Sequence, residues 1–278
     1  MYSCQETSLF LAPEILLSTT LGLYTLSEIA QIVGGTLHGK GSLEVSTIST
    51  DTRKIQQAKT CLFFAIHTSR NNGYKYIAQA KRLDVAAVLV SEKPNIEIDY
   101  IQVEDTLAAL QKLAAHHRSK FDIPTIAITG SNGKTIVKEW ISFLLQDKYN
   151  VCKSPKSYNS QIGVPLSIWQ LNSANNLGIF EAGISQPNEM QKLAEIIKPS
   201  IGVFTHLGDA HSVNFENEDE NRLGLFLGST VTNQEMDIDD EFPRDIIVEE
   251  LKELGRILNN YDEDGLTGKH GLIVGYDS

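Results

Sequence analysis

The stretch that most constrains the fold of this chain is "AITGSNGKTIVKEW", residues 127–140, in which a glycine-rich turn separates an apolar run from an amphipathic segment. The run before the turn, "TIAIT" (125–129), is a continuous β-branched and apolar stretch, as in parallel strands buried on both faces. The segment after it, "TIVKEWISFLLQ", has apolar residues at helical spacing: Val137, Trp140, Ile141, Leu144 and Leu145. The turn therefore joins a strand to a helix in an α/β sheet.

The chemistry of such a turn favours an anion. Successive backbone N–H groups point at one spot beside a helix N-terminus, which most commonly binds a phosphate. The segment T-G-S-N-G-K-T is tighter than the usual G-x-x-x-x-G-K-[ST] pattern, because its first glycine is Gly130 and isoleucine stands where that pattern has glycine. Lys134 would reach the terminal phosphates and the Thr135 hydroxyl would bind Mg²⁺. An ordinary strand-to-helix turn is the alternative for a bare G-K-T.

The rest of the sequence predicts two α/β units. Helical patterns at 25–33, 74–83 and 106–121 alternate with strand-like runs at 44–49, 60–66 and 86–91, and Pro124 marks the linker to the second unit. Thr25 or Ser27 could cap the first helix, and Gly34-Gly35 would end it. We therefore expect an N-terminal domain over 24–121, a central domain over 122–222, an N-terminal extension over 1–23 and an acidic tail over 223–278.

Composition and charge exclude several classes of protein. The chain is 41% hydrophobic and 21% charged, and no apolar run reaches the roughly 20 residues of a membrane span. No basic residue precedes the early apolar patch, so we expect a cytoplasmic protein without a secretory signal. Residues 212–278 hold 17 acidic and 5 basic side chains, whereas residues 1–211 are almost neutral, which argues against broad nucleic-acid binding. Cys4, Cys61 and Cys152 lack metal-ligand spacing and are expected to be reduced thiols.

The segment "AITGSNGKT" resembles the ATP loop of the Mur ligases, the ATP-dependent amide-forming enzymes of peptidoglycan synthesis. The resemblance covers about residues 24–211 and is greatest to the family members that add D-alanyl-D-alanine to UDP-MurNAc-tripeptide, particularly in the form fused to alanine racemase. It implies a ligase of cell wall biogenesis, with roles in cell shape and division. Three further segments agree in order: "YNSQIGVPLSIWQL" (158–171), "IFEAGISQPNEM" (179–190) and "KPSIGVFTHLGDAH" (198–211).

The resemblance also implies a fold, cofactors and site residues. The fold would be a small UDP-sugar-binding α/β domain followed by an incomplete P-loop ATPase-type parallel sheet. ATP and Mg²⁺ would be the cofactors, and the peptidoglycan precursor and D-Ala-D-Ala the substrates. The ATP phosphates would lie against Gly130, Ser131, Asn132, Gly133 and Lys134. Thr135 and Glu181 would hold one Mg²⁺, and His211 a second; Lys134 and His211 would be the catalytic residues.

The segment "STDTRKI" is similar to the family's uridine-diphosphate segment. The candidates for the UDP-sugar end are Ser49, Thr50, Asp51 and Arg53, with Asn72, Gly73 and Tyr74 nearby. Asn159 would face the substrate or the nucleotide.

Plainer interpretations of these residues stay open. A lone carboxylate such as Glu181 at a strand end is more often a cap or a salt-bridge partner, and His211 alone would be a surface or packed histidine. Arg53 would ordinarily be a surface charge. Four more residues have no assigned role: Trp140 and Trp169 are expected in the core, and His116 and His117 in solvent.

The resemblance stops after His211. The family continues with a helix carrying a carbamylated lysine that bridges the metal ions and with a closing domain, but no lysine lies between His211 and Lys252. Residues 245–258 could form an amphipathic helix within a tail of unassigned role. We therefore expect a truncated central domain with little or no turnover. A non-catalytic UDP-sugar and ATP-binding module is the alternative, and a related ligase acting on folate or another Mur precursor is disfavoured by the N-terminal match.

Overall fold

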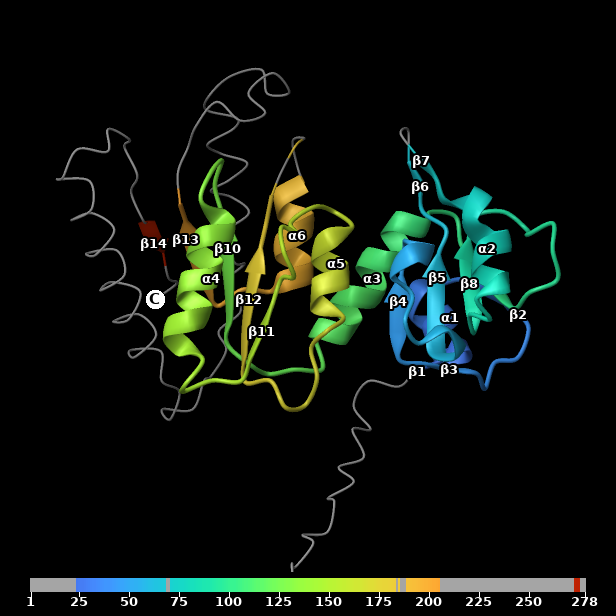
Figure 1. Ribbon diagram of the computed structural model, residues 1–278, viewed down its shortest axis with the longest axis horizontal. Coiled ribbons are helices and arrows are strands. Elements are labelled where there is room, and N and C mark those ends of the chain that lie inside the picture. Colours follow the sequence, from blue (N-terminus) through green and yellow to red (C-terminus); the bar gives the residue numbers. More distant parts are fainter. Residues whose placement is uncertain (1–23, 69–70, 184, 186–188, 206–272, 276–278) are drawn as a thin grey trace, which may run out of the picture.

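The computed structural model describes residues 24–68, 71–183, 185, 189–205 and 273–275. Within them the chain forms two α/β units, as the sequence predicted, and each unit is built on a five-stranded sheet (Figure 1). The extension at 1–23, most of the acidic tail, the helix expected at 245–258 and His211 lie outside the described residues.

The N-terminal sheet is parallel except at one edge. Its strand order is β2 (Thr36–His38), β9 (Tyr100–Gln102), β8 (Ala87–Val90), β5 (Cys61–Phe64) and β4 (Thr47–Ser49). Only β2 is antiparallel to its neighbour. All residues of β5 and β8 are buried, as expected for parallel strands covered on both faces.

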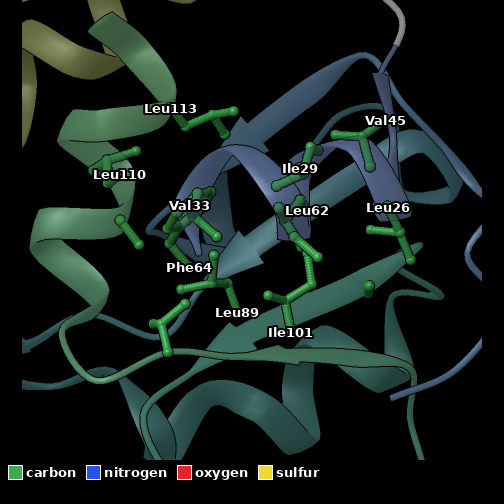
Figure 2. Packing of buried hydrophobic residues seen from close by; sticks show 14 of the residues in the cluster. Leu26, Ile29, Val33, Val45, Leu62, Phe64, Leu89, Ile101, Leu110 and Leu113 are labelled. Atoms are coloured by element: carbon green, nitrogen blue, oxygen red, sulfur yellow. The ribbon is translucent and has the colours of Figure 1, made fainter. Parts of the chain in front are cut away.

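Helix α1 (Leu26–Val33) covers one face of this sheet and has local start and stop signals. Thr25 is its N-cap and forms a capping box with Glu28, and Gly34 ends it in the left-handed conformation at φ 73°. The apolar stripe of α1 packs onto β5, β8 and β9 and meets Leu110 and Leu113 from α3 (Thr106–Arg118), as Figure 2 shows. The short strands β1 (Tyr24–Thr25) and β3 (Glu44–Val45) pair beside it.

A second apolar cluster covers the opposite face of the N-terminal sheet, beneath α2 (Ile77–Arg82). The segments that connect the strands and helices of this unit hold or adjoin the UDP-sugar candidates. They comprise η1 (Thr52–Lys54), η2 (Ala58–Thr60), β6 (His67–Thr68), β7 (Asn71–Asn72) and η3 (Gly73–Tyr76).

The central sheet has the order β11 (Val151–Lys153), β12 (Leu177–Glu181), β10 (Thr125–Thr129), β13 (Ile201–Phe204) and β14 (Ile273–Gly275). Strands β10 to β13 are parallel, which confirms the interpretation of residues 125–129, and β14 is antiparallel to β13. Helix α4 (Lys134–Leu145) covers one face, while α5 (Gly163–Ile168) and α6 (Glu189–Ile197) cover the other.

Helix α3 packs against both units, contacting α1 on one side and α5 and α6 on the other (Figure 1). Trp169 is buried at this junction, as predicted, and its Nε1 donates to the Ser46 carbonyl at 3.1 Å. His116 is exposed as expected, but the solvated position predicted for His117 is wrong. His117 is 2% exposed because its ring nitrogens find partners in Tyr24 and Leu171, which belong to the two different units.

The orientation of α4 overturns the core position predicted for Trp140. The buried residues of α4 are Val137, Ile141 and Leu145, with Lys138 and Ser142 beside them. Trp140 is 45% exposed and Leu144 is 41% exposed, together with Ile136 and Phe143. The helix turns its polar flank inward because Lys138 meets a buried carboxylate there, which the helical periodicity by itself does not reveal.

Two expectations from composition can be compared with the described residues. Cys61 and Cys152 are free and buried, as expected, and Cys4 lies outside the described part of the chain. Within that part, no helix combines the length and the hydrophobicity required to cross a membrane.

Candidate functional site

The glycine-rich loop lies between β10 and α4, where the sequence placed it. Gly130 has φ 134° and Gly133 has φ 82°, backbone conformations that residues with a Cβ rarely adopt. Gly133 is the N-cap of α4 and provides no side-chain cap, so the first N–H groups of the helix lack that usual acceptor. The loop therefore presents a helix N-terminus suited to an anion.

Lys134 folds back over this loop from the first turn of α4. Its Nζ donates to the carbonyl of Gly130 at 2.5 Å and to that of Ser131 at 3.4 Å. Burial lowers the pKa of Lys134, while the negative charge of Glu181 acts in the opposite direction. The ammonium is therefore partly desolvated and lies against the loop that would receive an anion.

Thr205, which sequence reasoning missed, fixes the loop from the neighbouring strand. Its hydroxyl donates to the carbonyl of Asn132 at 2.5 Å, and it contacts the carbonyl of Thr129 at 3.2 Å. Thr205 follows β13 directly and is buried. The only signal in the sequence was its place in the matched "GVFTHLGDAH" segment, since nothing local shows that this threonine reaches residue 132.

Thr135, Glu181 and Asn159 meet at the carboxyl ends of two adjacent parallel strands. Ile128 of β10 pairs with Glu181 of β12, so the loop after one strand lies beside the end of the other. Oε2 of Glu181 lies 3.3 Å from the Thr135 hydroxyl and 3.5 Å from Nδ2 of Asn159. The tertiary structure thus gathers three residues that the sequence resemblance had singled out separately.

This constellation fits Mg²⁺ by its chemistry. A hydroxyl and a carboxylate are oxygen ligands, and Mg²⁺ usually takes only one or two carboxylates and completes its shell with water and phosphate oxygens. The described residues contain no cluster of three or more His, Cys, Asp or Glu that could hold a metal by themselves. The donor set therefore suits an ion that arrives with a nucleotide.

Glu181 is fully buried and is paired with Lys138. Both side chains are 0% exposed, and Lys138 Nζ lies 3.0 Å from Oε1 of Glu181. The salt-bridge interpretation of Glu181 is therefore correct, alongside its contact with Thr135. Sequence reasoning missed Lys138, because nothing local shows which of the residues beside the buried stripe of α4 faces inward.

Asn159 is held by the chain that follows Glu181. Its carbonyl accepts from the Gly183 N–H at 2.8 Å. A Cβ at Gly183 would lie 3.0 Å from Cγ of Asn159, so a larger residue there would displace that side chain by a few tenths of an ångström. The close approach keeps Asn159 against the end of β12.

The UDP-sugar candidates lie in the N-terminal unit, at the last residue of β4 and in the turn that follows it. Ser49 is buried and its hydroxyl donates to the Asp51 carbonyl at 2.9 Å, while Thr50 is partly exposed. Arg53 is 83% exposed and donates to both carboxylate oxygens of Asp51, at 2.9 and 2.8 Å, which lowers the pKa of that carboxyl group. The predicted surface position of Arg53 is therefore correct, and it leaves the guanidinium accessible.

The segment around Asn72, Gly73 and Tyr74 forms a turn in the same unit. The Asn72 side chain accepts from the Tyr74 N–H at 2.9 Å, and Gly73 fits closely against the backbone of Ala65 and Ile66. This turn packs on the cluster beneath α2 that also holds Ile55, so the two candidate UDP segments share one face of the sheet.

A contact that the sequence did not reveal joins the two candidate regions. Lys54 Nζ donates to Tyr158 Oη at 2.6 Å and lies 5.0 Å from the centre of the Tyr158 ring. Lys54 follows Arg53, and Tyr158 precedes Asn159. The UDP-sugar candidates and the Asn159 loop are therefore neighbours in space.

Known proteins show the same combination of sequence and fold. Residues 128–221 match the Mur ligase middle domain. The UDP-N-acetylmuramoyl-tripeptide–D-alanyl-D-alanine ligase of Bacillus subtilis is 34% identical over 192 residues, which is 67% of this chain and 42% of the relative. The chain resembles the Mur ligases. It spans about two fifths of the length of the curated relatives it matches.

Solved structures of MurF share this fold. MurF from Acinetobacter baumannii superposes with a TM-score of 0.67 over 74% of this chain and 46% of its own, at 24% identity. MurF from Thermotoga maritima, solved in complex with ADP, has a TM-score of 0.59 over 66% of this chain and 43% of its own, at 26% identity. The resemblance to MurF that the sequence predicted is confirmed, whereas the similarity to the form fused to alanine racemase stays a prediction.

Proposed function

We propose that this chain takes part in ATP-dependent amide-bond formation in peptidoglycan precursor synthesis, adding D-alanyl-D-alanine to UDP-MurNAc-tripeptide in the cytoplasm. The observation that carries the proposal is the convergence of Thr135, Asn159 and Glu181 at the N-terminus of α4, beside Lys134. The named activity of its relatives, and the ADP in the solved Thermotoga relative, support it.

The chemistry requires the residue types found here. An amide forms from a carboxylate once that group is made electrophilic, and transfer of the γ-phosphoryl group of ATP gives an acyl phosphate that an amine can attack. Such a transfer is catalysed mainly by positioning and by cations where negative charge gathers. Lys134 and the N–H groups of α4 would hold the phosphates. Thr135 and Glu181 would hold Mg²⁺, which neutralises charge on the phosphate oxygens when it is bound.

The N-terminal unit would bind the other end of the substrate. Ser49, Thr50, Asp51 and Arg53 would hold the UDP-sugar, with Arg53 offering an exposed guanidinium near the diphosphate. The Lys54–Tyr158 contact would hold this unit against the Asn159 loop, so that one substrate can reach both regions. In the same proposal, His211 would hold a second Mg²⁺.

A non-catalytic module that binds UDP-sugar and ATP is the second candidate. It is favoured by the way the described residues alone assemble both the loop at 130–135 and the UDP segment at 49–53. Binding in this case would occur without turnover.

Phosphate release separates the two candidates. The purified chain would be given ATP, Mg²⁺, UDP-MurNAc-tripeptide and D-Ala-D-Ala, and each substrate would be omitted in turn. Release that requires all three substrates supports the ligase. Calorimetric binding of ADP and of the UDP-tripeptide without release supports the binding module. Absence of both binding and release would contradict both candidates.

A further inference from the structure

Lys138 is a lysine in the hydrophobic interior of the central unit. Its side chain is 0% exposed, and fully buried lysines are rare unless they are paired. Its Nζ donates to the carbonyls of Ser154 at 2.8 Å and Lys156 at 2.5 Å. It also lies 3.0 Å from Glu181 Oε1 and 3.2 Å from Glu139 Oε1.

The two carboxylate oxygens of Glu181 face different partners. Oε1 lies against the Lys138 ammonium, whereas Oε2 lies near the Thr135 hydroxyl and the Asn159 amide. Among the described residues Oε1 accepts no hydrogen bond of good geometry. Its contact with Lys138 is therefore an ion pair without a well-aligned hydrogen bond. Oε2 is therefore the carboxylate oxygen that faces Thr135 and the glycine-rich loop.

Lys138 also joins three segments around this carboxylate. Its carbonyl partners lie just after β11, in the segment that leads to Asn159, and Lys156 there has a φ of 52°. The Ser154 hydroxyl accepts from the Glu181 N–H at 3.1 Å. One ammonium group therefore connects α4, the end of β12 and the Asn159 segment.

Stability alone does not explain a buried pair of this kind. Replacing a buried ion pair by apolar residues of similar volume is often neutral or stabilising, and Lys138 lies beside the apolar stripe of α4. Removing only the lysine, however, leaves the buried Glu181 carboxylate without the ammonium group that contacts Oε1. Such a group lowers its energy by moving towards other donors or solvent, and that movement takes a metal ligand away from its place.

We propose that Lys138 is a positioning residue for the metal-nucleotide site, which holds the Glu181 carboxylate with Oε2 towards Thr135. The inference rests on the proposed function, because it assigns Glu181 to Mg²⁺. Lys138 does not touch the nucleotide in this role and acts only through Glu181. Outer partners of metal ligands commonly influence metal affinity in this way.

The test measures ADP affinity by calorimetry, once with Mg²⁺ and once with EDTA. In Lys138→Met the gain in affinity from Mg²⁺ should fall by about 10- to 100-fold, while affinity in EDTA is retained. The matched control is Lys153→Met, since Lys153 pairs with Glu139 at 2.5 Å but is partly exposed and does not contact Glu181. The control should keep the full Mg²⁺-dependent gain.

A second comparison covers the case in which Lys138→Met fails to fold. Lys138→Met added to Glu181→Gln removes both buried charges, so this double variant should fold. Its Mg²⁺-dependent gain should equal that of Glu181→Gln alone, because Lys138 acts through Glu181. A further loss would overturn the proposal, as would an unchanged or larger Mg²⁺-dependent gain in folded Lys138→Met.

The same measurements distinguish this inference from the proposed function. Equal losses with Mg²⁺ and with EDTA in Lys138→Met would make Lys138 a structural residue and overturn the inference alone. An absence of Mg²⁺-dependent ADP binding in the unaltered chain would overturn the proposed nucleotide site, and the inference with it.

Discussion

Tyr24 Oη lies 3.0 Å from Nδ1 of His117, although 93 positions separate the two residues. The other ring nitrogen, Nε2, lies 3.0 Å from the Leu171 carbonyl, which can only accept, so Nε2 carries the proton and Nδ1 accepts from Tyr24. Trp169 packs against both rings, with centroid distances of 5.2 Å to Tyr24 and 4.8 Å to His117. A neutral histidine thus links the N-terminal and central units in the interior.

Acidification should weaken the fold through His117. Burial lowers the pKa of His117 from 6.5 to about 4, so the unfolded chain binds a proton at a higher pH than the folded chain does. The contribution of His117 to the free energy of unfolding is complete above pH 6.5 and is lost progressively between pH 6.5 and about 4. The full loss is about 3 kcal/mol, and urea denaturation across this range would measure it.

His117→Gln tests this assignment. The variant should be less stable at neutral pH, because a side chain with different geometry must replace the imidazole between Tyr24 and Leu171. Its stability should nevertheless fall less between pH 6.5 and 4 than that of the unaltered chain. An identical decline in the two proteins would show that other groups cause the pH dependence.

Lys134→Ala should abolish nucleotide binding and leave the fold intact. The loop conformation depends on Gly130 and Gly133, whose positive φ values do not require the lysine. Calorimetry with ADP measures the loss, and thermal denaturation confirms the fold. Lys192→Ala, an exposed lysine on α6, is the control and should bind ADP normally. Unchanged affinity in Lys134→Ala would exclude the loop as the phosphate site.

Arg53→Ala should weaken binding of UDP-MurNAc-tripeptide and spare ATP. A charged hydrogen bond to a phosphate contributes roughly 1.5–3 kcal/mol, which corresponds to a loss of about 10- to 100-fold in affinity. The exposed position of Arg53 predicts little change in stability. Separate calorimetric titrations with each ligand provide the comparison, and equal losses for both would indicate misfolding in place of a lost contact.

Arg118→Met should be strongly destabilising. The buried guanidinium donates to four carbonyls and one hydroxyl, which join the end of α3, the linker, β10 and the end of α6. Its loss leaves several buried acceptors unpaired, at a cost of about 3 kcal/mol or more in the free energy of unfolding. Urea denaturation measures the effect, and Arg82→Met, at an exposed position at the end of α2, should change stability little. Equal stabilities would contradict this role.

The acceptors of Arg118 are the carbonyls of Ile197, Phe121, Ile123 and Lys198 and the Thr125 hydroxyl. Only the contact with the Phe121 carbonyl, three residues further along the chain, is local in the sequence. The contacts with Ile197 and Lys198 depend on α6 packing against α3, about 80 residues further along the chain.

The strand, loop and helix at 125–145 were predictable because their causes are local. Glycine permits the positive φ values of the loop, and the apolar run at 125–129 requires burial. Within residues 134–145, apolar side chains recur with the period of a helix. The capping box of Thr25 and the left-handed Gly34 are likewise set by neighbouring residues. The sequence by itself thus determined the fold class, the position of the loop and the MurF resemblance.

Only the tertiary structure decided which of these residues meet. Apolar residues at 137, 141 and 145 define a buried stripe on α4, but either flank of that stripe could face inward: Trp140 and Leu144, or Lys138 and Ser142. The pairing of β10 with β12 brought Glu181 beneath α4, and its charge selected the flank with Lys138. Burying a carboxylate is costly without a countercharge, and that cost depends on a partner more than forty residues away, which no local pattern records.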